Sequence, residues 1–469
     1  MTAGNASDHV PASRHWRPVA LLVAATAFME FLDATVITTA LPPMAASFHV
    51  LPVDLNVGIT AYMLALAVII PLSGWIADRY GARHVFAAAV AIFTAASVLC
   101  ALSGSLAQFT AARVLQGIGG ALTVPVGRLI VLRASERRDL IAAIAYLTWP
   151  SLLAPIIAPA LGGFITERLG WHWIFLINVP LGVIALALAF VLIPVQAGRT
   201  APFDTRGFTL TALASLAAMY GLERVGGGAG LRSLPWLLLG ASAVLITLAV
   251  RHFRRAAAPL IDLTVLRVRS YSVTMLGGSA SRAAINAAPF LLPLMFQEGF
   301  GLGPLASGLM LVPLFAGNAL MKVVTTPVLR AFGFRRALLV NGVLGAVTLA
   351  ATAFVTAATP PAWTALLLFA GGLARSMQFT ALNTLGFAEV PARQTAAANT
   401  LASMQTRLSA ALGVALGALI LRLGALAHGV GAPRVADFHL AFCIMGALAL
   451  AGALDALRLE EDAGASVRR

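Results

Sequence analysis

The chain has 469 residues, of which 59% are hydrophobic and only 11% are charged, and its mean hydropathy is +0.89. Soluble domains carry about 45–50% apolar and roughly 25% charged residues. Too little charge is therefore present to cover a water-facing surface around so long a chain. The composition excludes a soluble enzyme, a secreted disulfide scaffold and a disordered regulator, and it predicts a polytopic membrane protein.

The net charge of +14 by itself would be compatible with binding to nucleic acid. The cations, however, stand in short clusters between apolar runs, at 133–138, 251–255 and 335–336. We therefore expect no nucleic-acid partner. The two cysteines, Cys100 and Cys443, lie far apart in apolar stretches, and the eight histidines fall in tails, loops or span ends. Neither set has the spacing of a metal site or of a catalytic cluster, so we expect neither a metal nor an enzyme.

Membrane-spanning helices need about 20 mostly apolar residues. The apolar runs predict fourteen of them, at 17–40, 54–73, 84–104, 107–131, 139–165, 171–194, 207–222, 234–251, 270–296, 305–329, 336–356, 362–387, 395–422 and 436–457. These divide the chain into a cytoplasmic tail (1–16), a six-helix bundle (17–194), a linker with two additional helices (195–269), a second six-helix bundle (270–457) and a second tail (458–469). The polar first residues contain no cleavage site for a removable signal peptide.

Arginine counts in the loops predict the orientation in the membrane. With the N-terminus in the cytoplasm, 21 arginines fall in inner loops and tails, and four fall outside. Both termini are therefore expected to be cytoplasmic. Parity supports the short central pair of spans. If only one of the two crossed the membrane, the second half would be inverted and its arginine clusters would face outward.

The two halves share a loop pattern. The loop after the second span contains Gly81 and Arg83, and the corresponding loop of the second half contains Gly333 and Arg335, at the same offset. Asp78 of the first loop is replaced by Arg330 in the second. Two related bundles around a central cavity are typical of secondary transporters.

Four motifs in the first 180 residues are more specific. The first span contains Leu32-Asp33-Ala-Thr35 and Ala40-Leu41-Pro42, and the loop after the second span contains Gly74, Asp78, Arg79, Gly81 and Arg83. Span four contains Arg113-Val-Leu-Gln116-Gly117-Ile-Gly119-Gly120-Ala121. Span five contains Ala158-Pro159-Ala-Leu-Gly162-Gly163, followed by Trp171-His-Trp173-Ile-Phe-Leu-Ile-Asn178-Val-Pro180.

In this order the motifs resemble the major facilitator superfamily. More narrowly, they resemble its fourteen-helix drug:proton antiporters of the EmrB/QacA type, and the MdtD-like branch most closely. The resemblance implies an all-helical fold of two six-helix bundles plus two central helices, and a monomer in the bacterial cytoplasmic (inner) membrane. It also implies export of small molecules by drug:proton antiport. In span five the antiporter motif has glycines where this chain has Ala145, Ala154 and Ala158. The small side chains still allow close helix packing, but they do not leave the backbone uncovered as glycine would.

The energy source is expected to be a proton gradient, with no cofactor. Lys322 is the only lysine and is followed by Val323, so no nucleotide-binding loop ends in Lys-Ser/Thr. Of the 18 acids, only Glu30 and Asp33 lie well inside a predicted span. Buried acids of this kind are proton-coupling candidates, and Arg113 in span four is the expected counter-ion. The alternative is a permanent ion pair that only holds the first bundle together.

The loop residues Gly74, Asp78, Arg79, Gly81 and Arg83 are expected to act as a gate. In the family this loop latches the two halves together, and Asp78 would meet a helix N-terminus or an arginine across the interface. The alternative is that Arg79 and Arg83 only set the topology.

The substrate cavity is expected to contain seven polar or aromatic residues: Tyr62, Arg282, Asn286, Arg375, Gln378, Asn383 and Arg407. The second half offers cations but no acid inside its spans through span thirteen. Such a wall suits an organic anion or a metal–carboxylate chelate, whereas lipophilic cations gain from acids. The competing interpretation is that these cations pair with Glu30 and Asp33, or snorkel to a membrane interface. Multidrug efflux is thus the first hypothesis, anion export the second and uptake by symport the third.

Overall fold

The computed structural model describes residues 16–50, 55–148, 150–195, 198, 202–225, 233–302, 304–429 and 433–467. Within these ranges the regular secondary structure consists of helices, and no strand is present. The all-helical fold class expected from the apolar runs and from the family resemblance is confirmed.

The N-terminal half contains nine helices within its described residues. They are α1 (Trp16–Phe48), α2 (Asn56–Ile69), α3 (Ser73–Tyr80), α4 (Ala82–Ala101), α5 (Leu106–Ala134), α6 (Leu140–Thr148), α7 (Pro150–Arg168), α8 (Trp173–Leu176) and α9 (Asn178–Leu192). Predicted span five is thus divided between α6 and α7. Pro150 stands at the first position of α7, where its missing N–H costs no hydrogen bond.

The linker contributes α10 (Thr205–Arg224) and α11 (Ser233–Phe253). The C-terminal half consists of α12 (Arg269–Leu294), α13 (Pro304–Phe332), α14 (Phe334–Thr352), α15 (Pro361–Ala388), α16 (Thr395–Ala427) and α17 (Val435–Leu454). Short 3-10 and π turns join or extend these helices, among them Ile70–Leu72, Arg137–Asp139, Met295–Gly299 and Ala465–Val467.

Each of the fourteen predicted spans coincides with one or two of these helices. Among the described residues, eleven helical segments are long and apolar enough to cross a membrane. The other three predicted spans correspond to α6 with α7, to α10 and to α12. In α12 the polar residues Thr274, Ser281 and Arg282 are buried inside the protein. The helix can therefore be less apolar on average without presenting polar groups to lipid.

The repeated loop has the same backbone in both halves. Gly81 between α3 and α4 has φ +82°, and Gly333 between α13 and α14 has φ +76°. Positive φ is accessible to glycine without a steric penalty from Cβ. The glycines kept at one offset in the two sequences therefore make equivalent tight turns, as expected of two related bundles.

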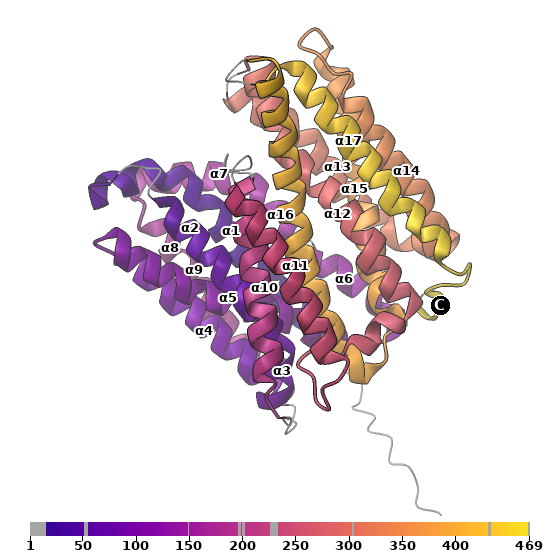
Figure 1. Ribbon diagram of the computed structural model, residues 1–469. Coiled ribbons are helices and arrows are strands. Elements are labelled where there is room, and N and C mark those ends of the chain that lie inside the picture. The colour runs from indigo at the N-terminus through magenta and orange to yellow at the C-terminus, as the bar shows by residue number, and fades with distance from the viewer. Residues whose placement is uncertain are drawn as a thin grey trace, which may run out of the picture.

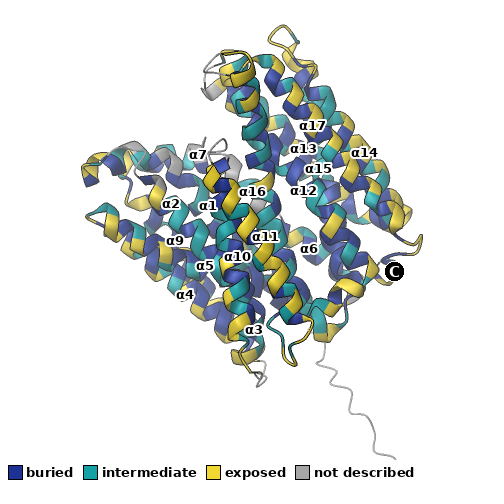
Figure 2. Cartoon of the chain, viewed as in Figure 1, coloured by how far each residue is buried: buried dark blue, intermediate teal, exposed yellow. Residues whose placement is uncertain are grey.

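Large apolar side chains cover the outer faces of the bundle, and the exposed residues follow those faces in Figure 2. Val191, Val323, Phe354 and Leu237 are each exposed by more than half of their surface. A soluble monomer rarely exposes so extensive an apolar surface. The distribution is that of helices surrounded by lipid.

The two halves meet at one end of the molecule and diverge toward the other (Figure 1). We name the first the α3 end; there α3 ends at Tyr80, α5 at Ala134 and α15 at Ala388. Leu140 and Ile144 of α6 share one apolar cluster with residues of α12, α14 and α15. The described structure is therefore closed at the α3 end by a hydrophobic core that belongs to both halves.

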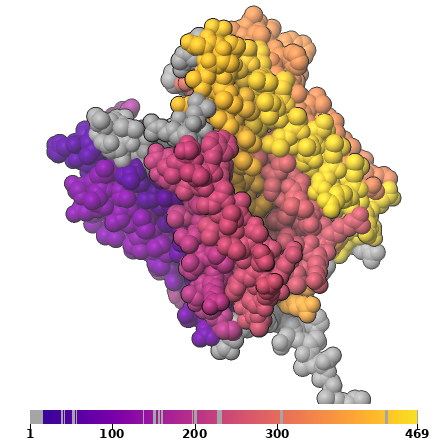
Figure 3. All heavy atoms as spheres, viewed as in Figure 1, coloured from indigo at the N-terminus to yellow at the C-terminus, as the bar shows by residue number. Residues whose placement is uncertain are grey.

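The linker helices lie across the junction of the two halves, on the face shown in Figure 3. α10 packs on α2 of one half and on α16 of the other, and Thr60 donates a hydrogen bond of 2.6 Å to Glu223. Asp204 caps α10 and also accepts hydrogen bonds from His252 and from the Leu260 amide. Burial alone would raise the pKa of Asp204, but these hydrogen bonds hold it below its ordinary value. The Asp204 contacts therefore stabilise the linker at neutral pH and weaken as the pH falls through that lowered pKa.

Candidate functional site

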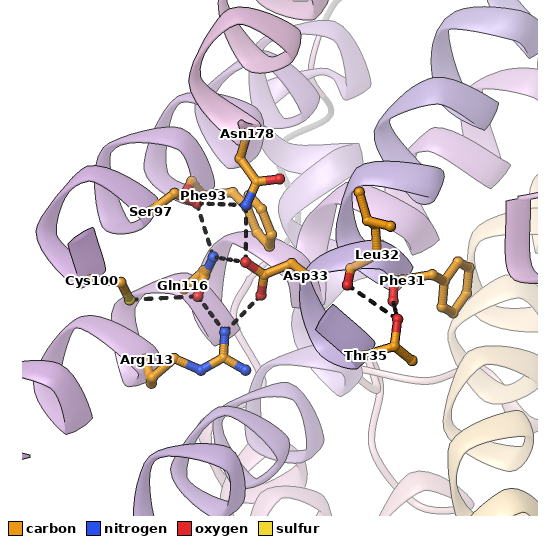
Figure 4. A network of polar contacts seen from close by, with 10 residues as sticks. All are labelled: Phe31, Leu32, Asp33, Thr35, Phe93, Ser97, Cys100, Arg113, Gln116 and Asn178. Carbon is orange, nitrogen blue, oxygen red and sulfur yellow. Dashed lines mark hydrogen bonds and ion pairs between the residues drawn. The ribbon is translucent and has the colours of Figure 1, made fainter. Parts of the chain in front are cut away.

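The first site is centred on Asp33, which is buried in the middle of α1. Arg113 Nη1 of α5 donates to Asp33 Oδ2 at 2.7 Å. Gln116 Nε2 and Asn178 Nδ2 each donate to Oδ1 at 2.9 Å. Figure 4 shows these donors converging on the carboxylate from α5 and α9. The predicted pairing of Asp33 with Arg113 is present, and both carboxylate oxygens are occupied.

The sequence interpretation did not include three members of this network. Gln116 belongs to the span-four motif and Asn178 to the run that follows the span-five motif, so a signal for both existed. Ser97 of α4 carries no motif, yet its Oγ accepts hydrogen bonds from both amides, at 2.9 and 3.3 Å. These contacts hold the two amides in position to donate to Asp33. Arg113 also donates to Gln116 Oε1 at 2.5 Å, so the network links four helices of the N-terminal half.

Glu30 belongs to a second site, three residues earlier on α1. Arg407 Nη2 of α16 donates to Glu30 Oε1 at 2.7 Å. The Glu30 side chain is 2% exposed and the Arg407 side chain 29%. The ion pair crosses from the N-terminal to the C-terminal half. The two neighbouring acids thus have separate arginine partners, one within a half and one between halves.

Tyr62 connects the two sites rather than standing in a separate cavity. The Arg113 guanidinium lies 4.3 Å from the centre of the Tyr62 ring, which is within range of a cation–π interaction. A Cβ on Gly120 of α5 would lie 3.1 Å from the Tyr62 hydroxyl and 3.3 Å from Glu30 Cδ. Gly120 of the span-four motif therefore leaves the space that Glu30 and Tyr62 share.

The seven residues expected around one substrate cavity fall into three groups by their contacts. Tyr62 and Arg407 belong to the acid sites. Arg282 donates to Asn383 at 2.9 Å and to the Thr274 carbonyl at 3.0 Å, and Asn286 donates to the Arg282 carbonyl. Arg375 and Gln378 line a different cavity inside the C-terminal half. Helix packing separates them because α12 and α15 each present polar residues on more than one face.

Comparison with known proteins identifies the family. A family model described as the Major Facilitator Superfamily matches residues 23–414 and 274–468. The chain belongs to the major facilitator superfamily. This is a family of transporters and not of enzymes, and the second match covers the C-terminal half of the chain, as a repeated fold requires.

Two relatives carry the same provisional name, multidrug resistance protein MdtD. The protein of Salmonella paratyphi A is 35% identical over 424 residues, covering 89% of this chain and 89% of the relative. The protein of Escherichia coli O6:H1 is 37% identical over 424 residues, covering 89% and 88%. The chain is thus an MdtD-like member of the superfamily, in agreement with the resemblance of its motifs.

Solved structures of the superfamily have the same fold. The human organic anion transporter MFSD10 (TETRAN) superposes with a TM-score of 0.68 at 16% identity, covering 95% of this chain and 100% of that one. The proton:xylose symporter XylE, bound to 6-bromo-6-deoxy-D-glucose, gives a TM-score of 0.62 at 14% identity, covering 93% and 94%.

The superfamily loop between α3 and α4 lies at the α3 end. Asp78 accepts a hydrogen bond of 2.6 Å from Arg133, which stands at the end of α5 in the same half. The contact expected across the interface is therefore made within one half in this structure. The Arg83 guanidinium lies 5.1 Å from the centre of the Phe190 ring, and Arg79 stands in the last turn of α3.

Gly74 makes the contact between halves that was expected of this loop. A Cβ on Gly74 would lie 2.6 Å from Thr400 Oγ1 and 3.2 Å from the Ala396 carbonyl of α16. Ser73 Oγ lies 3.5 Å from Thr400 Oγ1, and Asn399 donates to the Pro125 carbonyl of α5 at 2.7 Å. The missing side chain at Gly74 allows α3 and α16 to close on each other.

Gly74→Val is expected to open the α3 end. The added side chain has no space against α16, and overpacking of this kind costs about 1–3 kcal/mol. A cysteine at Asn399, in a Cys443→Ser background, should react faster with a water-soluble maleimide once Gly74 is replaced. Gly240→Val is the matched control, because a Cβ there has no neighbour within 4 Å. Equal labelling in both variants would contradict the role of Gly74.

The span-five motif lies on α7, which packs against α1. Ala154 and Ala158 are fully buried in one apolar cluster with Val36, Ile37 and Ala40 of α1. Small side chains allow two membrane helices to approach closely. Gly162 is buried and Gly163 is half-buried, whereas the side chain of Pro159 lies outside the described residues. The alanines that replace glycines in this chain therefore still permit close packing beside the Asp33 helix.

Proposed function

We propose that this chain is a proton-coupled secondary transporter of the bacterial cytoplasmic membrane, which exports small molecules by alternating access with both termini in the cytoplasm. Two buried acids on one helix support the proposal. Asp33 is paired within a half, and Glu30 is paired between the halves. Burying an acid at this depth costs free energy, so acids inside membrane helices are rare and usually functional. The multidrug resistance name of the relatives points to the same class of substrate.

The single observation that carries the proposal is the ion pair between Glu30 and Arg407. A proton on Glu30 removes its charge and with it most of the attraction between α1 and α16. Arg407 is then left half-buried without a counter-ion, a state that favours separation of the two helices. Proton binding and the relative position of the halves are thereby linked. Asp33 forms the ion pair with Arg113 inside the N-terminal half and provides the second titratable group.

The substrate site follows from the position of Arg407. The residue lines an apolar pocket with about 330 Å³ of empty space between α2, α10 and α16, together with Met63, Met219 and Met404. Methionine side chains are flexible and polarizable, so they adapt to ligands of different shape. A ligand in this pocket would contact the arginine that Glu30 holds. An anionic ligand that competes with Glu30 for Arg407, or a cationic ligand that competes with Arg407 for Glu30, would couple export to protonation.

A second candidate function is export of organic anions. Lys322 of α13 donates to Thr148 of the N-terminal half at 2.7 Å and to Thr380 at 2.6 Å. Within the described residues it has no acidic partner. A cation at the junction of the halves, bound only to hydroxyls, would favour a negatively charged substrate. Metal–carboxylate chelates belong to the same class.

The two candidates differ in proteoliposomes with an imposed pH gradient. Antiport predicts that vesicles with an acidic lumen accumulate substrate and lose it when a protonophore is added. Accumulation of cationic dyes would support multidrug efflux, and accumulation of di- or tricarboxylates would support the second candidate. Accumulation that requires an alkaline lumen would indicate symport instead. Substrate movement that does not depend on the pH gradient would overturn proton coupling.

A further inference from the structure

A cavity lies inside the C-terminal half, away from the junction between the halves. It has about 600 Å³ of empty space, part of it open to the outside, and its walls come from α12, α13, α14, α15 and α17. Most of the lining is apolar, including Leu314, Leu368 and Phe442. The polar lining gathers around Arg375 and Gln378 of α15. An apolar space with a few convergent polar groups is the usual form of a small-molecule site.

Arg375 has no counter-ion in the part of the chain that the structure describes. It makes no hydrogen bond or ion pair there, and its Nη1 is buried without a partner. No acidic residue lines the cavity. A guanidinium removed from water costs several kcal/mol unless an opposite charge compensates for it. The fold therefore keeps a half-buried positive charge, with one buried and unpartnered nitrogen, next to an empty space.

The N-terminal half shows how the same arrangement is completed. α5 and α15 are the fourth helical spans of their halves, and each carries the pattern Arg-x-x-Gln, as Arg113 with Gln116 and as Arg375 with Gln378. In α5, Arg113 Nη1 and Gln116 Nε2 both donate to the carboxylate of Asp33. In α15 the same two donor groups border the cavity. The C-terminal half thus carries the same donor pair, ten positions further along its helix than the loop repeat would place it, beside a cavity that no acid lines.

The third span of each half also contacts the glutamine, but in opposite directions. Asn341 of α14 donates to Gln378 Oε1 at 3.1 Å, whereas Ser97 Oγ of α4 accepts from Gln116 Nε2 at 2.9 Å. Gln378 Nε2 donates to no acceptor among the described residues. On α12, the counterpart of α1, Ser281 lines the cavity and its buried Oγ has no partner. Serine thus stands on the helix that carries the aspartate in the first half.

We propose that this cavity binds a small monocarboxylate with an apolar body, whose carboxylate pairs with Arg375 and Gln378 as Asp33 pairs with Arg113 and Gln116 in the N-terminal half. Arg375 Nη1 and Gln378 Nε2 donate to the two carboxylate oxygens, and Ser281 Oγ supplies a third hydrogen bond. The apolar walls contact the rest of the ligand. The site is separate from the junction of the halves, so it does not depend on the proposed function.

Binding is measured on the purified full chain by the shift of its thermal unfolding midpoint with ligand concentration. The probes are benzoate, which is supplied from water, and octanoate, which is also supplied from the membrane or detergent phase. Benzamide and octan-1-ol are their neutral matches. We expect the carboxylates to stabilise the protein and the neutral matches not to. The carboxylate that raises the unfolding midpoint more at equal concentration indicates whether the ligand comes from water or from the membrane phase.

Two variants test the residues. Arg375→Gln is expected to weaken carboxylate binding by about tenfold or more, because hydrogen bonds to a charged group contribute about 1.5–3 kcal/mol. Arg336→Gln, a matched replacement at an exposed arginine, should leave binding unchanged. Ser281→Asp should raise the midpoint without ligand and remove the response to benzoate, because an internal carboxylate then occupies the site.

Three results would overturn the inference. The first is equal stabilisation by carboxylates and by their neutral matches, or by neither, which is the result expected if only water fills the cavity. The second is unchanged binding in Arg375→Gln. The third, which decides the matter if Arg375→Gln does not fold, is a Ser281→Asp protein that still responds fully to benzoate. All three leave proton-coupled transport untouched, since no transport is measured.

Discussion

Asp33→Asn is expected to reduce proton-driven transport to the level of protein-free vesicles while the protein stays folded. Asparagine keeps the shape of the side chain and an oxygen that accepts from Arg113, but it cannot gain or lose a proton in this range of pH. Transport is measured in proteoliposomes with an acidic lumen, and folding by thermal unfolding followed by circular dichroism. Wild-type transport in this variant would contradict the assignment of Asp33 to proton coupling.

Two further measurements separate coupling from structure. Asp33→Ala leaves Arg113 buried without a counter-ion and should lower the free energy of unfolding by about 3–5 kcal/mol, so asparagine should be clearly less destabilising. Substrate exchange at equal pH on both sides needs no net proton movement and should persist in Asp33→Asn. Asp462→Asn, the same change at an exposed position, should leave both transport and stability unchanged.

The ion pair between Glu30 and Arg407 is expected to contribute a coupling energy of about 1–3 kcal/mol in a double-mutant cycle. Glu30→Gln and Arg407→Gln each remove the attraction, so the double variant should lose less stability than the sum of the two. The cycle is measured by unfolding at neutral pH. The coupling energy should fall as the pH is lowered, because a protonated Glu30 no longer attracts Arg407.

A matched cycle controls for position on α16. Arg422 lies on the same helix and, among the described residues, forms no ion pair. Arg422→Gln combined with Glu30→Gln should therefore give additive losses of stability. If this control shows the same coupling as Arg407, or if Arg407 shows none, the link between the two halves does not depend on the Glu30 pair.

The fold class, the spans and the pair of Asp33 with Arg113 could be predicted from local features of the sequence. Low charge and runs of about 20 apolar residues require lipid around the helices. The repeated Gly-x-Arg loop indicates two related halves, and Gly81 and Gly333 do make equivalent turns. Asp33 and Arg113 could be paired in advance because a buried acid and a buried arginine in one bundle each need an opposite charge.

The contacts of the loop between α3 and α4 were predicted only in part. Gly74 was recognised by its motif, but the motif does not specify which helix packs against the glycine. The structure places α16 against it. Asp78 was expected to reach across the interface, and the end of α5 brings Arg133 closer. Which charge meets which is set by the length and tilt of the helices, and these are not local properties.

The sequence by itself determined that this protein lives in a membrane, that it has two related helical halves and that very few charges remain inside. Only the tertiary structure decided how those charges are divided. Arg407 meets Glu30 from 377 positions away, Ser97 supports Asp33 without any motif, and Arg375 faces an empty space. The physical reason is that a buried charge needs a compensating group, but the local sequence does not specify which residue supplies it. The choice is made by side-chain packing between helices that are distant in the chain.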